Sequence, residues 1–312
     1  MHISSGRWLY GLSLSLVTTL LWGVLPIQLK LVLQSMDPVT VTWYRLFSSG
    51  LLLFAWLAAS RRLPALRPLG RGGRGLLLLA IGGLAANYVL YMFGLERLSA
   101  ATTQLIIQVA PILLLLASLL VFRESFGLGQ CVGLLVLLLG FGLFFNQRLD
   151  ELFGSLGSYT LGVLTILASA LAWVFYGLAQ KQLLTLWSSA QIMMAIYLAC
   201  AALLTPWARP AQLFELSALQ AWLLLACCLN TLVAYGAFAE ALAHWEASRV
   251  SAALALTPLV TLGSVALAAA LWPALIAAED LNVLAYAGAL LVAAGSSLVA
   301  LAPTLLQRRR GR

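Results

Sequence analysis

The sequence is poor in charge, in histidine and in long polar stretches. Only 9% of its 312 residues are charged, and histidine occurs twice. The longest polar interval runs from residue 60 to residue 74, which is too short to fold as a separate domain. No acidic residue lies deep inside an apolar stretch. Groups for acid, base or nucleophilic catalysis are therefore scarce, and a membrane-embedded enzyme is the least favoured class of function.

Cysteine is also scarce and lacks the spacing of a metal site. The four cysteines all lie inside apolar stretches: Cys131, Cys200, Cys227 and Cys228. We interpret them as small buried apolar residues, which disfavours both a zinc site and a disulfide framework. The sequence predicts no metal, no cofactor and no catalytic residue.

Apolar residues, in contrast, make up 62% of the chain, and the mean hydropathy is +0.99. A membrane-spanning helix needs about 20 mostly apolar residues. Ten stretches qualify, at about 8–30, 38–59, 75–95, 98–122, 127–146, 159–181, 190–208, 218–240, 248–272 and 282–303. The first lacks a small-residue cleavage site and continues to Lys30, so we expect a retained helix. The predicted class is an all-α integral membrane protein with ten transmembrane helices.

Basic residues are distributed unevenly between the two predicted membrane faces. If the N-terminus is cytoplasmic, thirteen of the 18 Lys and Arg residues lie inside and four lie outside. This bias predicts that both termini face the cytoplasm of a bacterial-type inner (plasma) membrane. It also explains the net charge of +8 as anchoring to the lipid bilayer, so no nucleic-acid partner is expected.

The two halves of the chain resemble each other. Three similar shifts align Trp22 with Trp173, Lys30 with Lys181, Tyr88 with Tyr235, Pro111 with Pro258, Glu124 with Glu279 and Gly140 with Gly295. The matches are colinear and indicate two five-helix copies, at residues 8–146 and 159–303. Because five is odd, the second copy must start on the opposite side of the membrane. The predicted architecture is two inverted five-helix repeats.

The region from Pro111 through a Leu run to Arg123 and Glu124, followed by a glycine-containing helix, resembles the EamA-type domain of the drug/metabolite transporter superfamily. The segment around Pro258, followed by Glu279 and Gly288, is similar. The resemblance implies ten helices, cytoplasmic termini and transport of small metabolites or drugs, often as export. We therefore expect a permease that exports amino acids or related or drug-like compounds by alternating access.

Two other function classes remain as alternatives. A channel-like facilitator would need a continuous polar pore, and a membrane enzyme would need convergent acids, histidines or a nucleophile. The expected partners are a small-molecule substrate and the bilayer, with the protein a monomer or a homodimer. Glycines in the fifth and tenth helices, Gly133 and Gly140 and then Gly288 and Gly295, predict close helix contact within a scaffold.

Polar and aromatic residues at membrane depth are the candidate substrate-binding residues. They combine an apolar body with a polar handle, which suits a pocket for a largely apolar metabolite. The candidates are Trp22, Tyr44, Arg45, Asn87, Tyr88, Tyr91, Gln104, Gln108, Trp173, Tyr176 and Tyr235. We expect Trp22, Tyr91, Gln104 and Trp173 to converge on one central cavity.

Three of these candidates have competing interpretations. Gln104 and Gln108 share one helical face, so they either line a cavity or join packed helices. Their counterparts in the second copy are Ser251 and Ala255, so this polar face exists in one half only. Arg45 is a cation inside a span: it binds a substrate carboxylate, extends to the outer interface, or pairs with Glu96.

Overall fold

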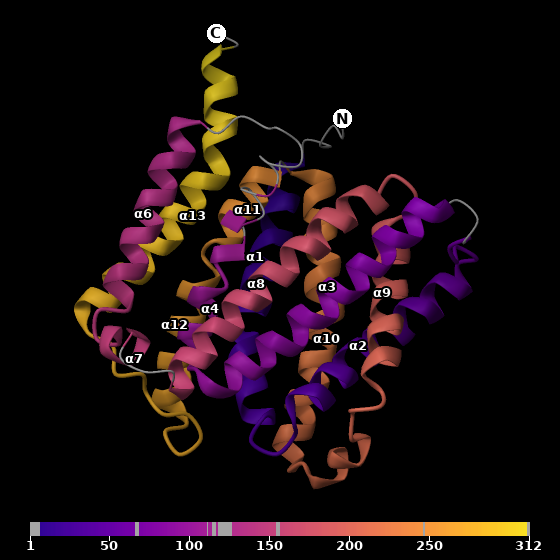
Figure 1. Cartoon of the computed structure of the whole chain (residues 1–312), viewed down its shortest axis with the longest axis horizontal. Helices are drawn as coiled ribbons and strands as arrows, with labels where there is room; N and C mark the ends of the chain where they lie inside the picture. Colours follow the sequence, from indigo (N-terminus) through magenta and orange to yellow (C-terminus); the bar gives the residue numbers. More distant parts are fainter. Residues whose placement is uncertain are drawn as a thin grey trace.

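The protein is built from helices alone within the described part of the chain. The computed structural model describes residues 7–65, 69–110, 112–113, 117, 127–153, 157–245 and 247–310 (Figure 1). The first half holds α1 (Trp8–Val32), α2 (Pro38–Ala59), α3 (Gly70–Arg97), α4 (Ala100–Ile106) and α6 (Leu128–Phe144). The short α7 (Leu149–Phe153) precedes the second half, which holds α8 (Ser158–Leu183), α9 (Ser189–Leu204), η2 (Pro210–Glu215), α10 (Ala218–His244), α11 (Ala247–Leu254), α12 (Thr257–Leu271) and α13 (Val283–Arg310).

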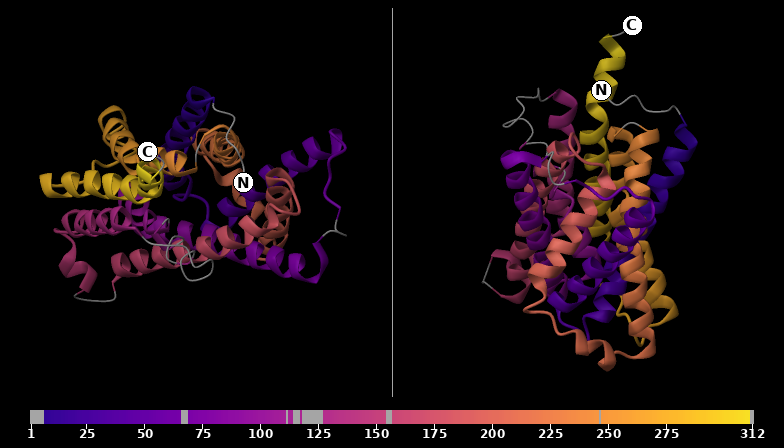
Figure 2. Two further views of the ribbon diagram at one scale, coloured as in Figure 1. Left: turned by 90° about the horizontal axis from the view of Figure 1, so that it is seen from above. Right: turned by 90° about the vertical axis from the view of Figure 1, so that its right-hand side faces the viewer.

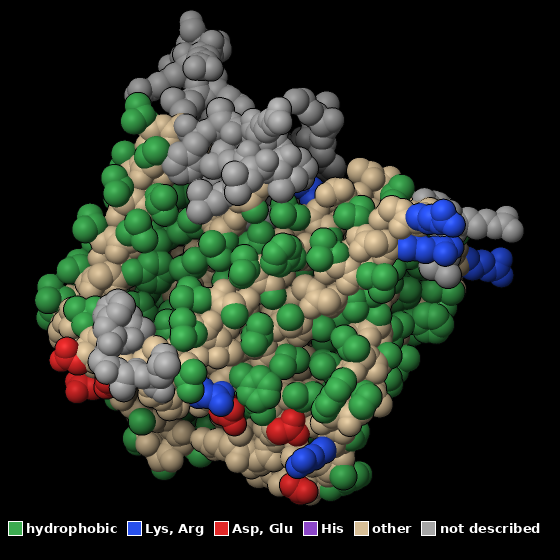
Figure 3. Space-filling view, viewed as in Figure 1, with side chains coloured by type: hydrophobic (Ala, Val, Ile, Leu, Met, Phe, Trp, Pro, Cys, Tyr) green, Lys and Arg blue, Asp and Glu red, His purple; other side chains and the backbone are tan. Residues whose placement is uncertain are grey.

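Seven segments of these helices are long and apolar enough to cross a membrane, and α6 and α9 are shorter apolar helices. Together with α4, they account for the ten expected stretches. In the space-filling view, hydrophobic side chains cover the middle of the visible face, while charged side chains gather toward its ends (Figure 3). This banding is what a bilayer requires of an integral membrane protein.

Local sequence signals define where several helices begin. Asp37 precedes Pro38, and its Oδ1 accepts hydrogen bonds from the backbone N–H groups of Val39 and Thr40, both at 3.0 Å. This is an N-cap followed by a proline at a position that has no intrahelical partner to lose. Ser188 and Ser217 start α9 and α10 through capping boxes with the glutamine three residues later.

Two expected spans are not continuous helices. The stretch 98–122 begins as α4 but forms a turn at residues 107–108, and the stretch 248–272 divides into α11 and α12 around residues 255–256. Pro258, which has no N–H for the helical ladder, lies just after the second interruption. Pro111, Arg123 and Glu124 lie outside the described residues. Helices α7 and η2 were not predicted, because both are short and lie in loops.

Each helix of the first half packs against the second half in a symmetric pattern. The repeat relates the pair α1 with α10 to the pair α8 with α3. In each of the other three pairs, a helix packs against its own counterpart: α2 with α9, α4 with α12 and α6 with α13. Helix α1 starts at the end where both termini lie, and α8 starts at the opposite end (Figure 1). These are the features of two inverted five-helix repeats joined along their whole length.

Helices α6 and α13 form one flank of the molecule and lie side by side (Figure 2, left). Their facing glycines allow direct backbone contact: a Cβ added at Gly288 would lie 2.5 Å from the Phe144 nitrogen and 2.6 Å from the Gly140 carbonyl oxygen. A Cβ at Gly133 or Gly295 would also meet the opposite backbone at under 3 Å. The expectation of close helix contact at these glycines is confirmed.

Candidate functional site

The interrupted helices of the two repeats face each other at the centre of the fold. Helix α4 packs against α12, and both contact α1. At the first interruption the Gln108 N–H donates to Leu105, three residues back, instead of four. At the second interruption, the Leu259 N–H donates to the Leu256 carbonyl, three residues back, instead of to the Ala255 carbonyl. Backbone carbonyls near both turns therefore lack their usual helical donors.

Side chains from three elements donate to backbone carbonyls at the second turn. Thr257 Oγ1 donates to the Leu254 carbonyl at 2.5 Å, replacing the N–H that Pro258 lacks. Gln108 Nε2 donates to the Ala255 carbonyl at 3.2 Å, and Thr19 Oγ1 donates to the Ala253 carbonyl at 3.2 Å. A helix can be interrupted inside the membrane only where its freed backbone groups find other hydrogen-bond partners, as they do here.

These bonds resolve the two interpretations of the paired glutamines. Gln108 joins the two repeats directly, because Ala255 is its own counterpart in the second copy. Gln104 Oε1 accepts a hydrogen bond from the Tyr91 hydroxyl at 3.2 Å. Both glutamines are buried. Gln108 therefore acts as an interhelical contact, whereas Gln104 and Tyr91 form a polar pair beside the interruption of α4.

Arg45 lies within the protein, only 4% exposed. Its Nε donates to Thr231 Oγ1 of α10 at 3.1 Å, and its guanidinium carbon lies 4.9 Å from the centre of the Tyr88 ring. The Thr231 hydroxyl in turn donates to the Cys227 carbonyl at 2.9 Å, which leaves its oxygen lone pairs toward Arg45. The side chain is thus held between α2, α3 and α10.

Both structural alternatives for Arg45 are wrong. A guanidinium that is 4% exposed does not extend to the outer interface. Glu96 does not pair with it, because the Glu96 carboxylate lies 3.6 Å from Arg97. Among the described residues, no acidic side chain forms an ion pair with Arg45. A buried cation without a described counter-charge makes Arg45 a candidate functional residue.

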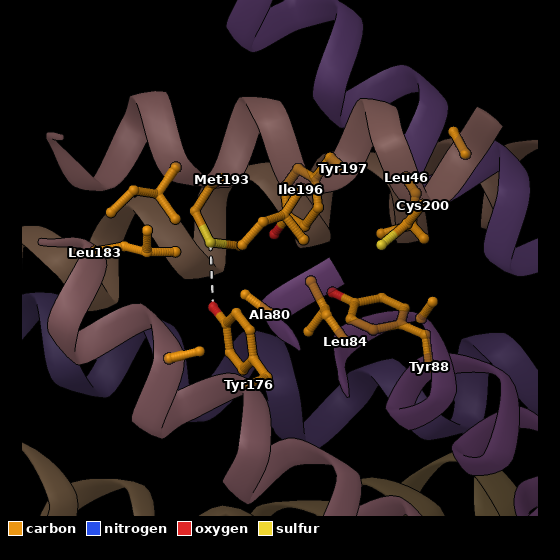
Figure 4. Close-up of a cluster of buried hydrophobic side chains, with 14 of the residues drawn as sticks. Leu46, Ala80, Leu84, Tyr88, Tyr176, Leu183, Met193, Ile196, Tyr197 and Cys200 are labelled. Carbon is orange, nitrogen blue, oxygen red and sulfur yellow. Dashed lines mark hydrogen bonds between the residues drawn. The ribbon is translucent and has the colours of Figure 1, made fainter. Parts of the chain in front are cut away.

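Four tyrosines form a phenol cluster next to Arg45: Tyr88, Tyr176, Tyr197 and Tyr235. Tyr176 donates its hydroxyl to Met193 Sδ at 3.2 Å (Figure 4). The Tyr88 hydroxyl faces those of Tyr197 and Tyr235, but the Tyr88 and Tyr197 hydroxyls make no hydrogen bond of normal geometry with the described residues. Two buried phenol donors therefore remain unused.

The remaining candidates lie at different distances from this cluster. Trp22 packs edge to face on Tyr235 with ring centres 5.2 Å apart, and Trp173 packs against the larger apolar core that contains Tyr88, Tyr176 and Tyr197. Asn87 instead joins α3 to α8 through Ser169, and Tyr44 donates to the Pro210 carbonyl at the start of η2. Trp22 and Trp173 thus approach the phenol cluster, while Tyr91 and Gln104 form a separate pair near the α4 turn.

Sequence reasoning missed Tyr197, which lies at the centre of the cluster with 1% exposure. Its position in the otherwise apolar α9 was a signal, since a buried tyrosine usually needs a partner for its hydroxyl. Thr19 was also missed. Its hydroxyl lies 2.8 Å from the Ser15 carbonyl of its own helix and 3.2 Å from the Ala253 carbonyl of α11, and no property of the α1 sequence indicates the second contact.

A polar corner at the end opposite the termini ties α1 to the junction of α3 and α4. Lys30 Nζ donates to the carbonyls of Leu95, Glu96 and Leu98 at 2.8, 3.1 and 2.5 Å. Across the same junction, the Ala101 N–H donates to Glu279 Oε1 at 3.2 Å. A cation at a helix C-terminus and an anion at a helix N-terminus are both favourable.

Burial raises the pKa of the Glu279 carboxyl, although hydrogen bonds from Ser99 and Ala101 and the charges of Lys30 and Arg148 oppose this. A raised pKa in the folded state means that ionisation opposes folding. The neutral Glu279 carboxyl therefore contributes its full share of stability at pH values below the ordinary pKa of a glutamic acid. This contribution is lost as the pH rises through the raised pKa of the folded state.

Glu279→Gln should therefore raise the melting temperature at pH 7.5, because the amide keeps an acceptor for Ala101 without a buried charge. The gain should vanish at about pH 4, where the wild-type carboxyl is itself neutral. Thermal unfolding of both proteins across this range measures the difference. Glu215→Gln, on exposed η2, is the matched control and should leave melting unchanged. Lower melting of Glu279→Gln at pH 7.5 would contradict the sign.

Comparisons with known proteins agree with this architecture. The profile of the EamA-like transporter family matches residues 9–146 and 160–301. The chain is 43% identical over 288 residues to the uncharacterized inner membrane transporter YhbE of Escherichia coli strain K12, covering 92% of this chain and 89% of that protein. An uncharacterized transporter of Haemophilus influenzae is 39% identical over 301 residues, covering 96% and 98%.

One solved structure, described only as a crystal structure of a protein, shares the fold with a TM-score of 0.65. It is 21% identical and covers 99% of this chain and 100% of its own. Both halves of the sequence match the same family, and relatives named as transporters align over nearly the whole length. The chain is a membrane protein that belongs to the EamA-like transporter family.

Proposed function

We propose that the protein is a secondary transporter that exports small metabolites, among them amino acids and related or drug-like compounds, by alternating access. One observation carries this proposal: the interrupted helices of the two inverted repeats meet, with Gln108 of one bonded to the Ala255 carbonyl of the other. Interrupted helices between inverted repeats are where carriers of this architecture place substrate and concentrate motion.

The packing of the repeats supports a rocking motion. Each of the five helix pairs joins one repeat to the other. A rotation of one repeat relative to the other about the pseudo-twofold axis therefore changes the packing of all five pairs together. The turns at residues 107–108 and 255–256 divide α4 and the α11–α12 segment, which allows one part of each span to move without the other. Such motion closes one side of the central site as it opens the other.

We assign the candidate residues two kinds of role. Arg45, Tyr88, Tyr235, Trp22 and Trp173 contact substrate around the phenol cluster, and Tyr91 with Gln104 extends the path beside α4. The others position these groups: Gln108, Tyr176, Asn87 and Tyr44.

Counterflow in proteoliposomes tests the proposal. Vesicles of purified protein are loaded with one unlabelled compound from a panel of amino acids and small drug-like molecules, and a trace of the labelled compound is added outside. A carrier gives transient, saturable accumulation because loaded sites exchange faster than empty ones return. A channel gives uptake without overshoot, which would reject alternating access. Empty vesicles are the control.

The proposal includes an orientation with both termini in the cytoplasm, supported by the excess of basic residues at that end. Reporter fusions after residue 67 and after residue 312 should be active only with a cytoplasmic reporter. A fusion at residue 150 should be active only with a periplasmic one. The opposite result at residue 150 would mean that five spans do not precede it.

A further inference from the structure

Arg45, Tyr88 and Tyr197 together hold hydrogen-bond donors from which no described residue accepts with normal geometry. Within the described part of the chain, Arg45 uses Nε on Thr231 and leaves its two terminal nitrogens without a protein partner. Tyr88 and Tyr197 are 5% and 1% exposed, and their hydroxyls also lack a hydrogen bond there. Buried donors left unused are costly, so their collection at one place points to a ligand that accepts from them.

The geometry of the donors selects the chemistry of what they bind. A guanidinium whose Nε is already fixed by Thr231 offers its remaining N–H groups as a planar fork, which matches a carboxylate. The Tyr88 ring lies against the guanidinium and restrains its plane. Figure 4 shows Tyr88 and Tyr197 with their hydroxyls turned into the same interior between α3 and α9.

Charge restricts the ligand further. The site carries one positive charge, and its other polar groups are neutral phenols and a threonine. A singly charged anion cancels this charge, whereas a phosphate dianion would leave a net buried charge at high cost. Aromatic rings continue from the cluster toward α1, where Tyr235 contacts Trp22 and Trp22 contacts Phe238 at 5.8 Å. These rings offer an apolar wall for the rest of the ligand.

We infer that Arg45, Tyr88 and Tyr197 form the binding site for the carboxylate of a monocarboxylate substrate with an apolar or aromatic body. This inference rests on the proposed function for its physiological meaning, but binding can be measured without transport. Arg45 neutralises the carboxylate and orients it, while the two hydroxyls donate to its oxygens. A compound whose carboxylate is replaced by a neutral amide loses both the charge and one acceptor.

Thermal stabilisation of the purified wild-type protein tests the site. The probes are the singly charged anions 3-phenylpropionate and 4-phenylbutyrate, each compared with its own neutral amide at equal concentration. We expect the two carboxylates to raise the melting temperature in a saturable manner and the amides to have no effect. Equal stabilisation by the amides, or no stabilisation by either carboxylate, would overturn the inference.

Two variants separate binding from structure. Arg45→Lys keeps the charge but loses the fork, and should weaken carboxylate binding about ten- to hundredfold, the loss expected for one charge-assisted hydrogen bond. Tyr197→Phe removes a hydroxyl that has no described partner, so the ligand-free protein should melt at the same or a higher temperature while carboxylate binding weakens. If the Tyr197 hydroxyl had a purely structural role, its removal would lower the melting temperature of the ligand-free protein and leave carboxylate binding unchanged. Unchanged binding in both variants would reject the assignment.

Tyr159→Phe is the matched control. It also removes one phenol oxygen, but Tyr159 lies in α8 with Arg148 5.6 Å from its ring, away from the phenol cluster. It should bind the carboxylates as the wild type does. If the carboxylates stabilise the wild type but no member of the panel shows counterflow, the binding site stands and the proposed transport function fails. Counterflow of amides as fast as acids would instead support transport and reject the carboxylate site.

Discussion

Gly288→Val should separate α6 from α13 and destabilise the protein by about 3 kcal/mol or more, beyond the usual cost of overpacking. The reason is that every near neighbour of the added side chain is backbone: the Phe144 nitrogen at 2.5 Å, the Gly140 carbonyl oxygen at 2.6 Å and the Phe144 Cα at 2.9 Å. A side-chain neighbour could rotate away, but two helix backbones can only move apart. That movement removes the close contact over several turns.

Gly142→Val is the matched control, because it introduces the same side chain on α6 where a Cβ meets nothing within 4 Å. Gly142 borders an apolar groove with Leu139 and Leu143, so the new methyl groups face an environment that accepts them. Melting of detergent-solubilised protein, followed by size-exclusion chromatography, compares the two variants. Wild-type melting of Gly288→Val would show that these helices do not depend on the close approach.

Gln108→Leu should reduce transport about three- to thirtyfold while leaving most of the protein folded. The substitution keeps the side-chain volume but removes the donor to the Ala255 carbonyl, at a turn where the helix supplies no replacement. Single interhelical hydrogen bonds in membranes contribute about 0.6 to 2 kcal/mol, so the loss of stability should be small. The same energy, applied to the balance between inward-open and outward-open states, changes the rate about three- to thirtyfold.

Initial counterflow rate and melting temperature on the same preparation decide this prediction. Gln182→Leu, on the exposed end of α8, controls for the gain of an apolar side chain and should transport at the wild-type rate. A large drop in melting temperature without a change in the rate of the folded fraction would make Gln108 a structural residue only.

The sequence allowed prediction of the elements that depend on local chemistry. The positions of the spans followed from apolar length, and the repeat followed from colinear matches such as Pro111 with Pro258. The glycines of α6 and α13 indicated close contact because a glycine inside a membrane helix lets a second backbone approach. A proline removes one backbone donor, which is consistent with the interruption of the helix just before Pro258.

Contacts between distant segments could not be predicted in the same way. The partner of Arg45 is Thr231, 186 residues away, and its selection depends on how α2, α3 and α10 pack together. Glu96 was a plausible partner by depth alone, yet it lies beside Arg97. Tyr197 has no counterpart in the repeat comparison, so the pattern that identified Tyr88 and Tyr235 did not include it. The depth of a residue in the membrane follows from its position along its own helix, whereas the neighbour that its side chain contacts depends on how the helices pack.

The bond from Gln108 to Ala255 has a consequence for how the protein is made and how its gene diverged. The copy synthesised first carries the amide donor, and the copy synthesised second carries the carbonyl that needs it. The N-terminal half thus enters the bilayer ready to receive its partner, whereas the C-terminal half expressed alone would expose an unsatisfied peptide group to lipid. After duplication the two copies ceased to be interchangeable. A tandem of two C-terminal halves would lack the glutamine donor at both turns, so one half can no longer replace the other.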